Sequence, residues 1–308
     1  MTRTAAVTGA AGFLGRHLVR ELQQQGWRVR ALVRRDSPPW EGTAPEEVRG
    51  DLADGAALRR LCEGADAVLH LAGRIKARRR ADFAAVNVEG ARAAAEAARD
   101  AAPDAAFVLV SSLAARAPQL SPYAGSKAAG ETEVRGLLPH AAVVRPPLVY
   151  GPGDLETLPL FQAAARGMLP WFNRRGRLAV IHAADAARQL ASAAGGRLAG
   201  RSVSISDGRP EGYAWRELLQ AAAAAVGGRP ILLPIPDALV SAAGRTGDLA
   251  ARLGAEPFLT SGKAREALHR DWSVAPGDRD VDQPTPRYTL QAGFADTAAW
   301  ARATGRLR

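Results

Sequence analysis

Three glycines, each three residues from the next, join a short apolar run to an amphipathic one near the start of the chain, and this spacing severely restricts the fold. Thr4 to Thr8 predicts a buried strand and Arg16 to Gln25 predicts a helix. Glycines spaced in this way allow a tight turn, close approach of the backbone to a pyrophosphate, and close packing of helix on strand. The free N–H groups at a helix start also attract an anion. We therefore expect a dinucleotide-binding turn whose contacts come from Gly9, Gly12, Phe13, Leu14 and Gly15.

The end of the next predicted strand bears on the choice of cofactor. This strand covers Arg28 to Val33 and is followed by Arg34 and Arg35, with Asp36 only afterwards. An acidic residue in this place hydrogen-bonds the ribose 2′-hydroxyl of NAD, whereas an arginine accommodates the 2′-phosphate of NADP. The two arginines favour NADP(H). NAD(H) is the alternative, because Asp36 can reach the ribose if the loop is shifted.

Strand and helix patterns continue to alternate along the first half of the chain. Strands are predicted at Glu47 to Arg49, Ala67 to Leu71 and Phe107 to Val110, and a helix from about Asp82 to Arg99. This alternation predicts an α/β protein with a doubly wound parallel sheet, a Rossmann fold that binds its ligand at the carboxyl ends of the strands. Residues at those ends are expected to contact the cofactor: Asp51, Leu52, Leu71, Ala72 and Gly73.

Tyr123 and Lys127 stand four residues apart in a stretch that follows the strand ending in Ser111-Ser112. On a helix, two such residues project from one face with Cβ atoms about 5–6 Å apart. A positive charge beside a phenol favours the phenolate and lowers the phenol pKa from its usual value of about 10. The pair is therefore a candidate general acid/base. A surface contact between two solvated side chains is the alternative.

The composition is that of a soluble globular protein, with 47% hydrophobic and 23% charged residues. No apolar run approaches the roughly 20 residues needed to span a bilayer, and no signal-peptide layout begins the chain, so we expect a cytoplasmic protein. The net charge is +10, but the arginines are spread along the chain and only 6% of residues are aromatic. We expect no nucleic-acid partner. The single cysteine, Cys62, excludes an intrachain disulfide and a cysteine-based metal cluster, and we expect no metal site.

Two denser basic stretches stand out from this even distribution of charge. A solvated loop is the preferred interpretation of each, and binding of a phosphate or an anionic substrate such as a diphosphate is the alternative. The first stretch follows a predicted strand end and the second lies in the later part of the chain: Arg74, Lys76, Arg78, Arg79 and Arg80, and then Asn173, Arg174, Arg175 and Arg177.

In this order, the motifs resemble the extended branch of the short-chain dehydrogenase/reductase superfamily, the NAD-dependent epimerase/dehydratase family. The resemblance covers nearly the whole chain. It is carried by Thr8-Gly9-x-x-Gly12-x-x-Gly15, Asp51-Leu52, His70-Leu71-Ala72-Gly73, Asn87 in Val-Asn-Val-Glu-Gly, Ser111-Ser112, Tyr123-x-x-x-Lys127, Arg145-Pro-Pro-Leu-Val-Tyr-Gly-Pro-Gly-Asp154, Val180-Ile-His-Ala-Ala-Asp185 and Val203-Ser-Ile-Ser-Asp207.

The resemblance implies a role for each residue of the candidate active site. Tyr123 would exchange a proton with the substrate oxygen while the nicotinamide exchanges a hydride at the same carbon. Lys127 would hydrogen-bond the nicotinamide ribose and keep the phenol pKa low. Ser112 would donate a hydrogen bond to the substrate oxygen, with Ser111 as the alternate, because successive strand residues face opposite ways. Asn87 would support the site or be a buried helix asparagine bonded to backbone.

Two departures from the pattern of nucleotide-sugar epimerases bear on the reaction. Only ten residues separate Ser112 from Tyr123, and Leu113 stands where some epimerases have a third serine. Pro146, a further expected cofactor contact, lies in Pro146-Pro147-Leu148, which looks more like the hydroxysteroid- and flavonol-type reductases. We expect an oxidoreductase that moves a hydride between NAD(P) and a secondary alcohol or ketone. The alternatives are a nucleotide-sugar epimerase/dehydratase with tightly bound NAD and a non-catalytic nucleotide-binding subunit.

The family resemblance also implies a division of the chain. Residues 1–150 and about 179–207 are expected to form the dinucleotide-binding Rossmann domain, and 151–178 with 208–308 a smaller C-terminal substrate-binding lobe. The expected substrate is a small molecule, with anionic compounds and nucleotide sugars among the candidates. The resemblance further implies a homodimer, formed through two helices of the nucleotide-binding domain.

Overall fold

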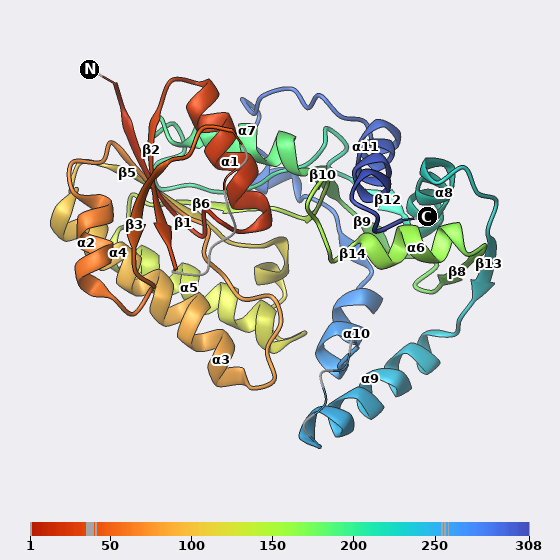
Figure 1. Cartoon of the computed structure of the whole chain (residues 1–308). Helices are drawn as coiled ribbons and strands as arrows, with labels where there is room; N and C mark the ends of the chain where they lie inside the picture. The colour runs from red at the N-terminus through yellow and green to blue at the C-terminus, as the bar shows by residue number, and fades with distance from the viewer. Residues whose placement is uncertain are drawn as a thin grey trace.

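A seven-stranded parallel sheet organises the first two thirds of the chain (Figure 1). The computed structural model describes residues 2–34, 40, 42–253, 255, 257 and 259–307. The strand order is β11-β6-β5-β4-β1-β2-β3, so the order reverses on either side of β1, where Rossmann folds bind their ligand. The strands are β1 (Thr4–Thr8), β2 (Arg28–Val33), β3 (Glu46–Arg49), β4 (Ala67–His70), β5 (Ala106–Val110), β6 (Ala142–Arg145) and β11 (Ser202–Ser204).

Helices cover both faces of this sheet, which confirms the doubly wound α/β fold. Successive strand residues alternate between the two apolar cores: Ala5 and Val7 pack on one side and Ala6 on the other. The first core is closed by two helices and the second by three. They are α1 (Phe13–Gln24) and α7 (Ala183–Ala193) on one face, and α2 (Gly55–Cys62), α4 (Gly90–Ala101) and α5 (Pro122–Leu137) on the other.

Helix α1 begins three residues earlier than the apolar pattern predicts, within the glycine turn itself. Gly12 is the residue that caps the helix, and Gly15 lies in its first turn. A Cβ atom on Gly15 would stand 2.1 Å from the carbonyl oxygen of Gly9, a separation that no side chain tolerates. The third glycine is therefore required because the helix starts against the strand end that precedes it.

The single helix predicted from Asp82 to Arg99 is interrupted by a turn of π-helix. It consists of α3 (Arg80–Ala84), the π-helical η1 (Ala85–Glu89) and then α4. Asn87 lies in the π turn and is buried. Helix α5 passes close to it, since a Cβ on Gly130 would lie 2.2 Å from the Asn87 carbonyl oxygen. The π turn thus lies where two helices approach too closely for an ordinary side chain.

A separate apolar core gathers elements from the second half of the chain. Its largest buried side chains are Tyr150, Phe161 and Phe294, and short strands pair around it as β10-β7, β12-β9-β14 and β13-β8. Helices α9 and α10 extend away from this core, toward the bottom of the view in Figure 1. The remaining elements are η2 (Leu113–Arg116), β7 (Leu148–Tyr150), α6 (Leu158–Ala165), β8 (Met168–Trp171), β9 (Arg177–Leu178), β10 (Val180–His182), β12 (Tyr213–Ala214), α8 (Trp215–Ala225), β13 (Ile231–Pro234), α9 (Asp237–Arg252), α10 (Ser261–Leu268), β14 (Asp271–Trp272), η3 (Pro276–Asp278) and α11 (Leu290–Ala303).

Among the residues that the structure describes, no helix combines the length and apolar character needed to cross a bilayer.

Candidate active site

The glycine turn after β1 is packed directly against the end of β4. Gly9 has a φ of +69°, and a Cβ atom there would lie 2.6 Å from the Ala72 nitrogen. Leu71 donates its N–H to the Thr8 carbonyl at 3.2 Å, and Ala72 donates its N–H to Thr8 Oγ1 at 3.3 Å. The two strand ends predicted to contact the cofactor therefore meet at the point where the sheet order reverses.

The start of α1 has the properties of an anion site. Its cap, Gly12, provides no side chain to bond the first N–H groups, and the first turn contains no acidic residue. The unsatisfied N–H groups of a helix start attract a phosphate. Phe13 at the same turn lies near Gly153, since a Cβ atom added to Gly153 would lie 3.4 Å from the Phe13 ring. This backbone cradle fits the pyrophosphate of a dinucleotide, and Gly9, Gly12 and Gly15 would hold it.

The strand ends beside this turn carry the residues predicted to select the cofactor. Arg34 is exposed at the end of β2, and its carbonyl accepts a hydrogen bond of 3.3 Å from Arg49 Nη1. Arg35 and the competing Asp36 lie outside the described residues. Asp51 is exposed after β3 and accepts the Ala53 N–H at 2.9 Å. Arg34 and Asp51 thus follow β2 and β3, the two strands that lie on one side of β1 in the sheet.

Leu52 and Pro146 are held in place by the surrounding fold. Leu52 is partly buried against the second apolar core, and a Cβ on Gly90 would lie 2.6 Å from the Leu52 side chain. Pro146 is buried after β6, and its carbonyl accepts the Leu113 N–H at 2.8 Å. This bond anchors the segment that follows Ser112.

Helix α5 positions Tyr123 and Lys127 on one face. Ser121 begins the helix by accepting the Ala124 N–H at 2.9 Å, and Pro122 occupies the first turn. Lys127 is buried and donates from Nζ to the Val110 carbonyl at 2.8 Å. Its Nζ is 3.7 Å from the position a Cβ on Gly73 would take. The lysine therefore faces the end of β4, beside the predicted cofactor contacts.

The two serines after β5 have different partners. The Ser112 side chain lies close enough to the Tyr123 phenol to lower its pKa, and Ser112 Oγ accepts the Ala114 N–H at 3.2 Å. Ser111 is buried on the opposite side of the chain from Ser112 and donates its hydroxyl hydrogen to Glu131. Alternation along the strand separates the two hydroxyls. Ser112 is the serine that the fold brings to Tyr123.

The pKa of Tyr123 differs from the sequence-based expectation. Burial raises it to about 12, the Ser112 side chain opposes that rise, and the negative charge of Glu266 adds to it. The expectation that the pKa of Tyr123 lies below its usual value is therefore wrong, because burial outweighs the influences that lower it. Lys127 itself is affected by burial, which lowers its pKa to about 8 against the opposing influence of Glu131. At neutral pH the phenol keeps its proton and the lysine keeps its charge.

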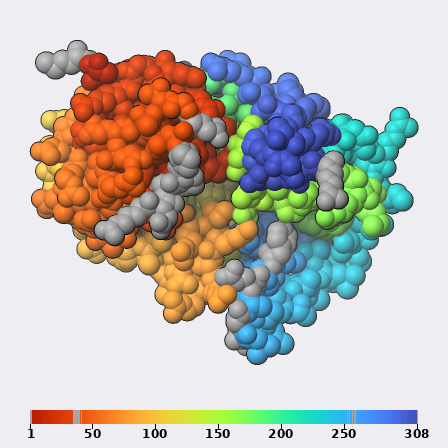
Figure 2. Space-filling view, in the orientation of Figure 1, coloured from red at the N-terminus to blue at the C-terminus, as the bar shows by residue number. Residues whose placement is uncertain are grey.

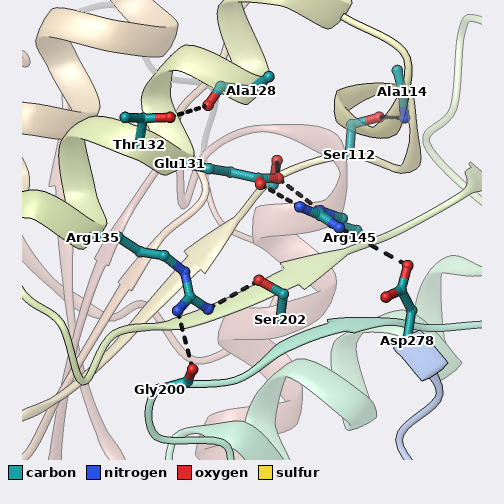
Figure 3. Close-up of polar contacts among 11 residues, drawn as sticks. Ser112, Ala114, Ala128, Glu131, Thr132, Arg135, Arg145, Gly200, Ser202 and Asp278 are labelled. Carbon is teal, nitrogen blue, oxygen red and sulfur yellow. Dashed lines mark hydrogen bonds and ion pairs between the residues drawn. The ribbon is translucent and has the colours of Figure 1, made fainter.

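A buried ion pair lies one helical turn beyond Lys127 (Figure 3). Arg145 donates from Nε to Glu131 Oε1 at 2.9 Å and from Nη2 to Glu131 Oε2 at 2.6 Å. Asp278 lies 3.9 Å from Arg145 on its other side. Sequence reasoning did not identify Glu131, although its place four residues after Lys127 on the same helix could have indicated it.

Asn87 is bonded to the backbone of the loop that follows β4. Its Oδ1 accepts the Arg74 N–H at 2.7 Å, and its Nδ2 donates to the Arg74 carbonyl at 3.0 Å and to Ser126 Oγ at 2.8 Å. A Cβ on Gly73 would lie 3.4 Å from Asn87 Oδ1. Asn87 thus fixes the loop beside Gly73 and ties it to the helix that carries Lys127.

Helix α10 closes the site from the second half of the chain. Glu266 accepts a hydrogen bond from Ser121, at the start of the helix that carries Tyr123, and Arg265 donates from Nε to the Leu120 carbonyl at 2.7 Å. Burial raises the pKa of Glu266. Sequence reasoning missed Glu266, since nothing local to it indicates a contact with a segment some 145 residues away. Figure 2 shows the surface hollowed between the orange part of the chain and the green and blue part.

The two basic stretches differ in what their members do. In the first, Lys76 pairs with Glu156 at 2.6 Å, and Arg79 pairs with Asp82 at 3.0 Å. In the second, Asn173 is buried and donates from Nδ2 to the carbonyls of Ala267 and His269 at 2.9 Å each. Asn173 therefore supports the fold, and does not face solvent as an anion contact would.

Arg177 of the second stretch is also engaged with backbone. It donates from Nε to the Glu211 carbonyl at 2.8 Å and from Nη2 to the Gly212 carbonyl at 2.7 Å. Arg174 lies with its guanidinium 4.8 Å from the centroid of the Trp171 ring. The packing of these two side chains removes most of the evidence for an anion site in this stretch.

Comparisons with known proteins show the family and the fold of this chain. The model of the NAD dependent epimerase/dehydratase family matches residues 5–195. A ceramide reductase of Caulobacter vibrioides is 49% identical over 306 residues, covering 98% of this chain and 95% of that protein. A 2-alkyl-3-oxoalkanoate reductase of Stenotrophomonas maltophilia is 30% identical over 325 residues, covering 94% and 96%. The crystal structure of gox2253 shares the fold, with a TM-score of 0.80, 24% identity and coverage of 100% of both chains.

Proposed function

Since this chain belongs to the NAD-dependent epimerase/dehydratase family, we propose that it is an NADP(H)-dependent reductase that converts a ketone into a secondary alcohol. Membership makes the protein an NAD(P)-dependent enzyme of this family. The direction, the proton donor, the choice of NADP(H) and the substrate class are our proposals. The observation that carries them is the position of Ser112 beside the phenol of Tyr123, next to a buried Lys127.

Ketone reduction requires a proton donor at the substrate oxygen. The phenol of Tyr123 keeps its proton at neutral pH because burial raises its pKa to about 12. A substrate oxygen placed between Ser112 and Tyr123 would accept hydrogen bonds from both hydroxyls, which stabilise the negative charge that develops there. Tyr123 then transfers its proton to that oxygen as the general acid. Ser112 holds the phenol and the oxygen in line for this transfer.

Lys127 supplies positive charge next to this proton transfer. The ammonium group is charged at neutral pH, because burial lowers its pKa only to about 8. That charge favours the phenolate that forms when Tyr123 has given up its proton. Its Nζ points toward Gly73, where the nicotinamide ribose of a dinucleotide held by the glycine turn would lie. When bound, the nicotinamide supplies the hydride.

The names of the two reductases suggest a substrate class. A ceramide and a 2-alkyl-3-oxoalkanoate share one unit: an oxygen-bearing carbon within a long alkyl chain, next to a carbon that carries a second chain. In the ceramide that second chain is attached through nitrogen. We propose that this protein reduces a ketone in such a two-chain compound. The identity of 49% over nearly the whole chain with the ceramide reductase favours the nitrogen-linked kind.

We also propose that residues 151–178 and 208–308 form the substrate-binding lobe. In support, the core around Tyr150, Phe161 and Phe294 is separate from the two cores of the sheet. Helix α10 reaches from this part of the chain to Ser121, next to Tyr123. A substrate between the two parts would contact both.

The decisive experiment follows NADPH consumption by the purified protein with two-chain ketones, water-soluble short-chain ketones and UDP-sugars, after identification of any copurifying nucleotide. We expect stoichiometric oxidation of added NADPH with a two-chain ketone and one alcohol formed per NADPH. Retained NAD that interconverts a UDP-sugar without net consumption of NADPH would instead establish the epimerase alternative. A protein that binds a nucleotide but turns over none of these compounds would contradict the reductase proposal.

A further inference from the structure

Exposed cations lie in the loop after β4 and at the start of α3, in the part of the chain that Asn87 ties to the helix of Tyr123. We call them the basic rim: Arg74, Lys76, Arg79 and Arg80. Glu156 and Asp82 offset two of these charges through ion pairs with Lys76 and Arg79. Positive charge therefore dominates this part of the surface.

Apolar side chains are exposed within the same rim. Ile75 stands next to Lys76, and Leu155 stands next to Glu156, so the two side chains flank the ion pair between Lys76 and Glu156. Both are largely exposed. Large apolar side chains exposed next to several cations are typical of surfaces that meet a lipid interface.

Helix α9 presents a second apolar surface. Leu239, Leu249 and Leu253 are 60%, 58% and 81% exposed. With 3.6 residues per turn, these three positions share one side of the helix. The other side, which includes Gly244 and Gly247, packs against α10 and the segment before it: a Cβ on Gly244 would lie 2.9 Å from Ala264, and one on Gly247 1.8 Å from the Leu259 carbonyl oxygen. Most of the surface of these leucines therefore lies in solvent, on the side of α9 and its C-cap away from α10.

The rim and the leucine side belong to the same end of the molecule. Helices α3, α9 and α10 all reach toward the bottom of the view in Figure 1. Helix α10 links α9 to the active site, since Glu266 bonds to Ser121 and α9 packs on α10. A flat surface applied to this end would therefore meet α3, α9 and α10 together.

We propose that this end of the protein docks on the surface of a bilayer that contains anionic lipids. The arginines and the lysine of the basic rim would contact the negative headgroups, and Ile75, Leu155 and the α9 leucines would enter the boundary between headgroups and acyl chains. The purpose of the docking rests on the proposed function, because a two-chain lipid substrate resides in a bilayer and would enter the hollow from it.

Charge distinguishes a bilayer from the other occupants of such a surface. A symmetric pair of copies would place one basic rim against another, and like charges brought together cost binding energy. A nucleic acid would be held by cations interleaved with aromatic rings on which bases stack. The exposed apolar side chains of this rim are Ile75 and Leu155, which offer no ring. An anionic lipid surface matches both the charge and the aliphatic character.

Sedimentation of the full chain with lipid vesicles tests the proposal. We expect binding to vesicles of phosphatidylcholine and phosphatidylglycerol, little binding to phosphatidylcholine alone, and weakening with salt. Arg74→Glu with Arg80→Glu should weaken the partition at low salt at least tenfold. Leu239→Ser with Leu249→Ser should weaken it at both low and high salt. Matched controls away from this end are Arg28→Glu, at the opposite ends of the strands, and Ile231→Ser on β13; both should bind as the parent does.

Three results would overturn the proposal. They are failure of the parent to bind the anionic vesicles, equal losses in the controls, and a change of molar mass by light scattering in the leucine variant without a loss of vesicle binding. Turnover of a water-soluble ketone by the same variants separates this test from that of the proposed function, since we expect it to be unchanged. A protein that binds vesicles but reduces no ketone would refute the proposed function and leave the docking established.

Discussion

Glu131 and Arg145 are joined by two parallel hydrogen bonds in the interior, one turn of α5 beyond Lys127. The pair brings helix α5 and strand β6 together, and Ser111 adds a third bond to the same carboxylate. The Glu131 charge also raises the pKa of Lys127 against the effect of burial. This arrangement connects the stability of the protein to the charge of its candidate active site.

Replacement of Glu131 by glutamine should therefore destabilise the protein. It leaves the Arg145 charge largely buried without its partner, and breaking such a pair costs about 3 kcal/mol or more of unfolding free energy. Chemical denaturation measures the loss. Glu133→Gln, at an exposed position on the same helix, is the matched control and should change stability little. A loss no greater than that of the control would contradict the importance of the pair.

Reduction should slow as the pH rises through about 8. The charge of Lys127 is present below its pKa of about 8 and is lost above it, so the support that this charge gives to the phenolate of Tyr123 disappears in that range. The profile of kcat/KM against pH measures this limb. Lys127→Arg should remove the limb, because arginine keeps its charge. Glu131→Gln should move the limb to lower pH. If neither substitution changes the limb, the limb reports the titration of another group.

Tyr123→Phe should lower kcat by about 10²–10⁴-fold, the usual contribution of a general acid. Affinity for the nucleotide, measured by fluorescence titration or calorimetry, should remain nearly the same, because the phenol hydroxyl acts on the substrate oxygen. Tyr288→Phe is a matched control that removes a tyrosine hydroxyl elsewhere in the protein. Full turnover in the Tyr123 variant would rule out the proposed proton transfer.

Arg34→Ala should weaken NADPH binding selectively. The side chain is exposed at the end of β2, where it can contact a 2′-phosphate, and loss of one such charged contact is worth a few kcal/mol or less. We expect an increase of at least tenfold in KM for NADPH with little change for NADH. Arg28→Ala, at the other end of the same strand, should affect neither. Equal losses for both cofactors would argue against a 2′-phosphate contact.

His70 should make stability depend on pH in the acid range. It is buried, bonds to Thr8 Oγ1 at 2.9 Å, and burial lowers its pKa from 6.5 to about 3. The unfolded chain therefore takes up the proton more readily. The stabilisation is complete above pH 6.5 and is lost as the pH falls from 6.5 toward 3, with a slope of at most about 1.4 kcal/mol per pH unit. His70→Asn should reduce this slope, while the exposed control His140→Asn should keep it.

Local patterns predicted the nucleotide-binding half of the fold well. The glycine turn, the strands around it and the position of Tyr123 and Lys127 on one helix follow from spacing over a few residues. The separation of Ser111 from Ser112 follows from strand alternation. These features depend on neighbours in sequence, and so the sequence alone indicates them.

The electrostatics of the site could not be predicted in the same way. The direction of the pKa shift at Tyr123 depends on burial, which several distant segments produce together. Glu266 reaches Ser121 from a helix far along the chain, and Asn173 is buried by segments that follow it by more than 90 residues. Such contacts arise from tertiary packing, and no local spacing encodes them.

The π turn at Ala85–Glu89 has a consequence for how this chain can change in length. A π turn accommodates one residue more than a regular α-helix does, so it sets the rotational phase between the segments on either side. Here Phe83 before it lies beside Tyr123, and Ala94 and Ala98 after it face the sheet. Deleting one residue in η1 would therefore make the helix regular and leave the two segments close to their present orientation, whereas deleting one residue in α4 would rotate the segment beyond it by roughly 100°. A single-residue deletion should therefore be tolerated better in η1, away from Asn87, than in α4.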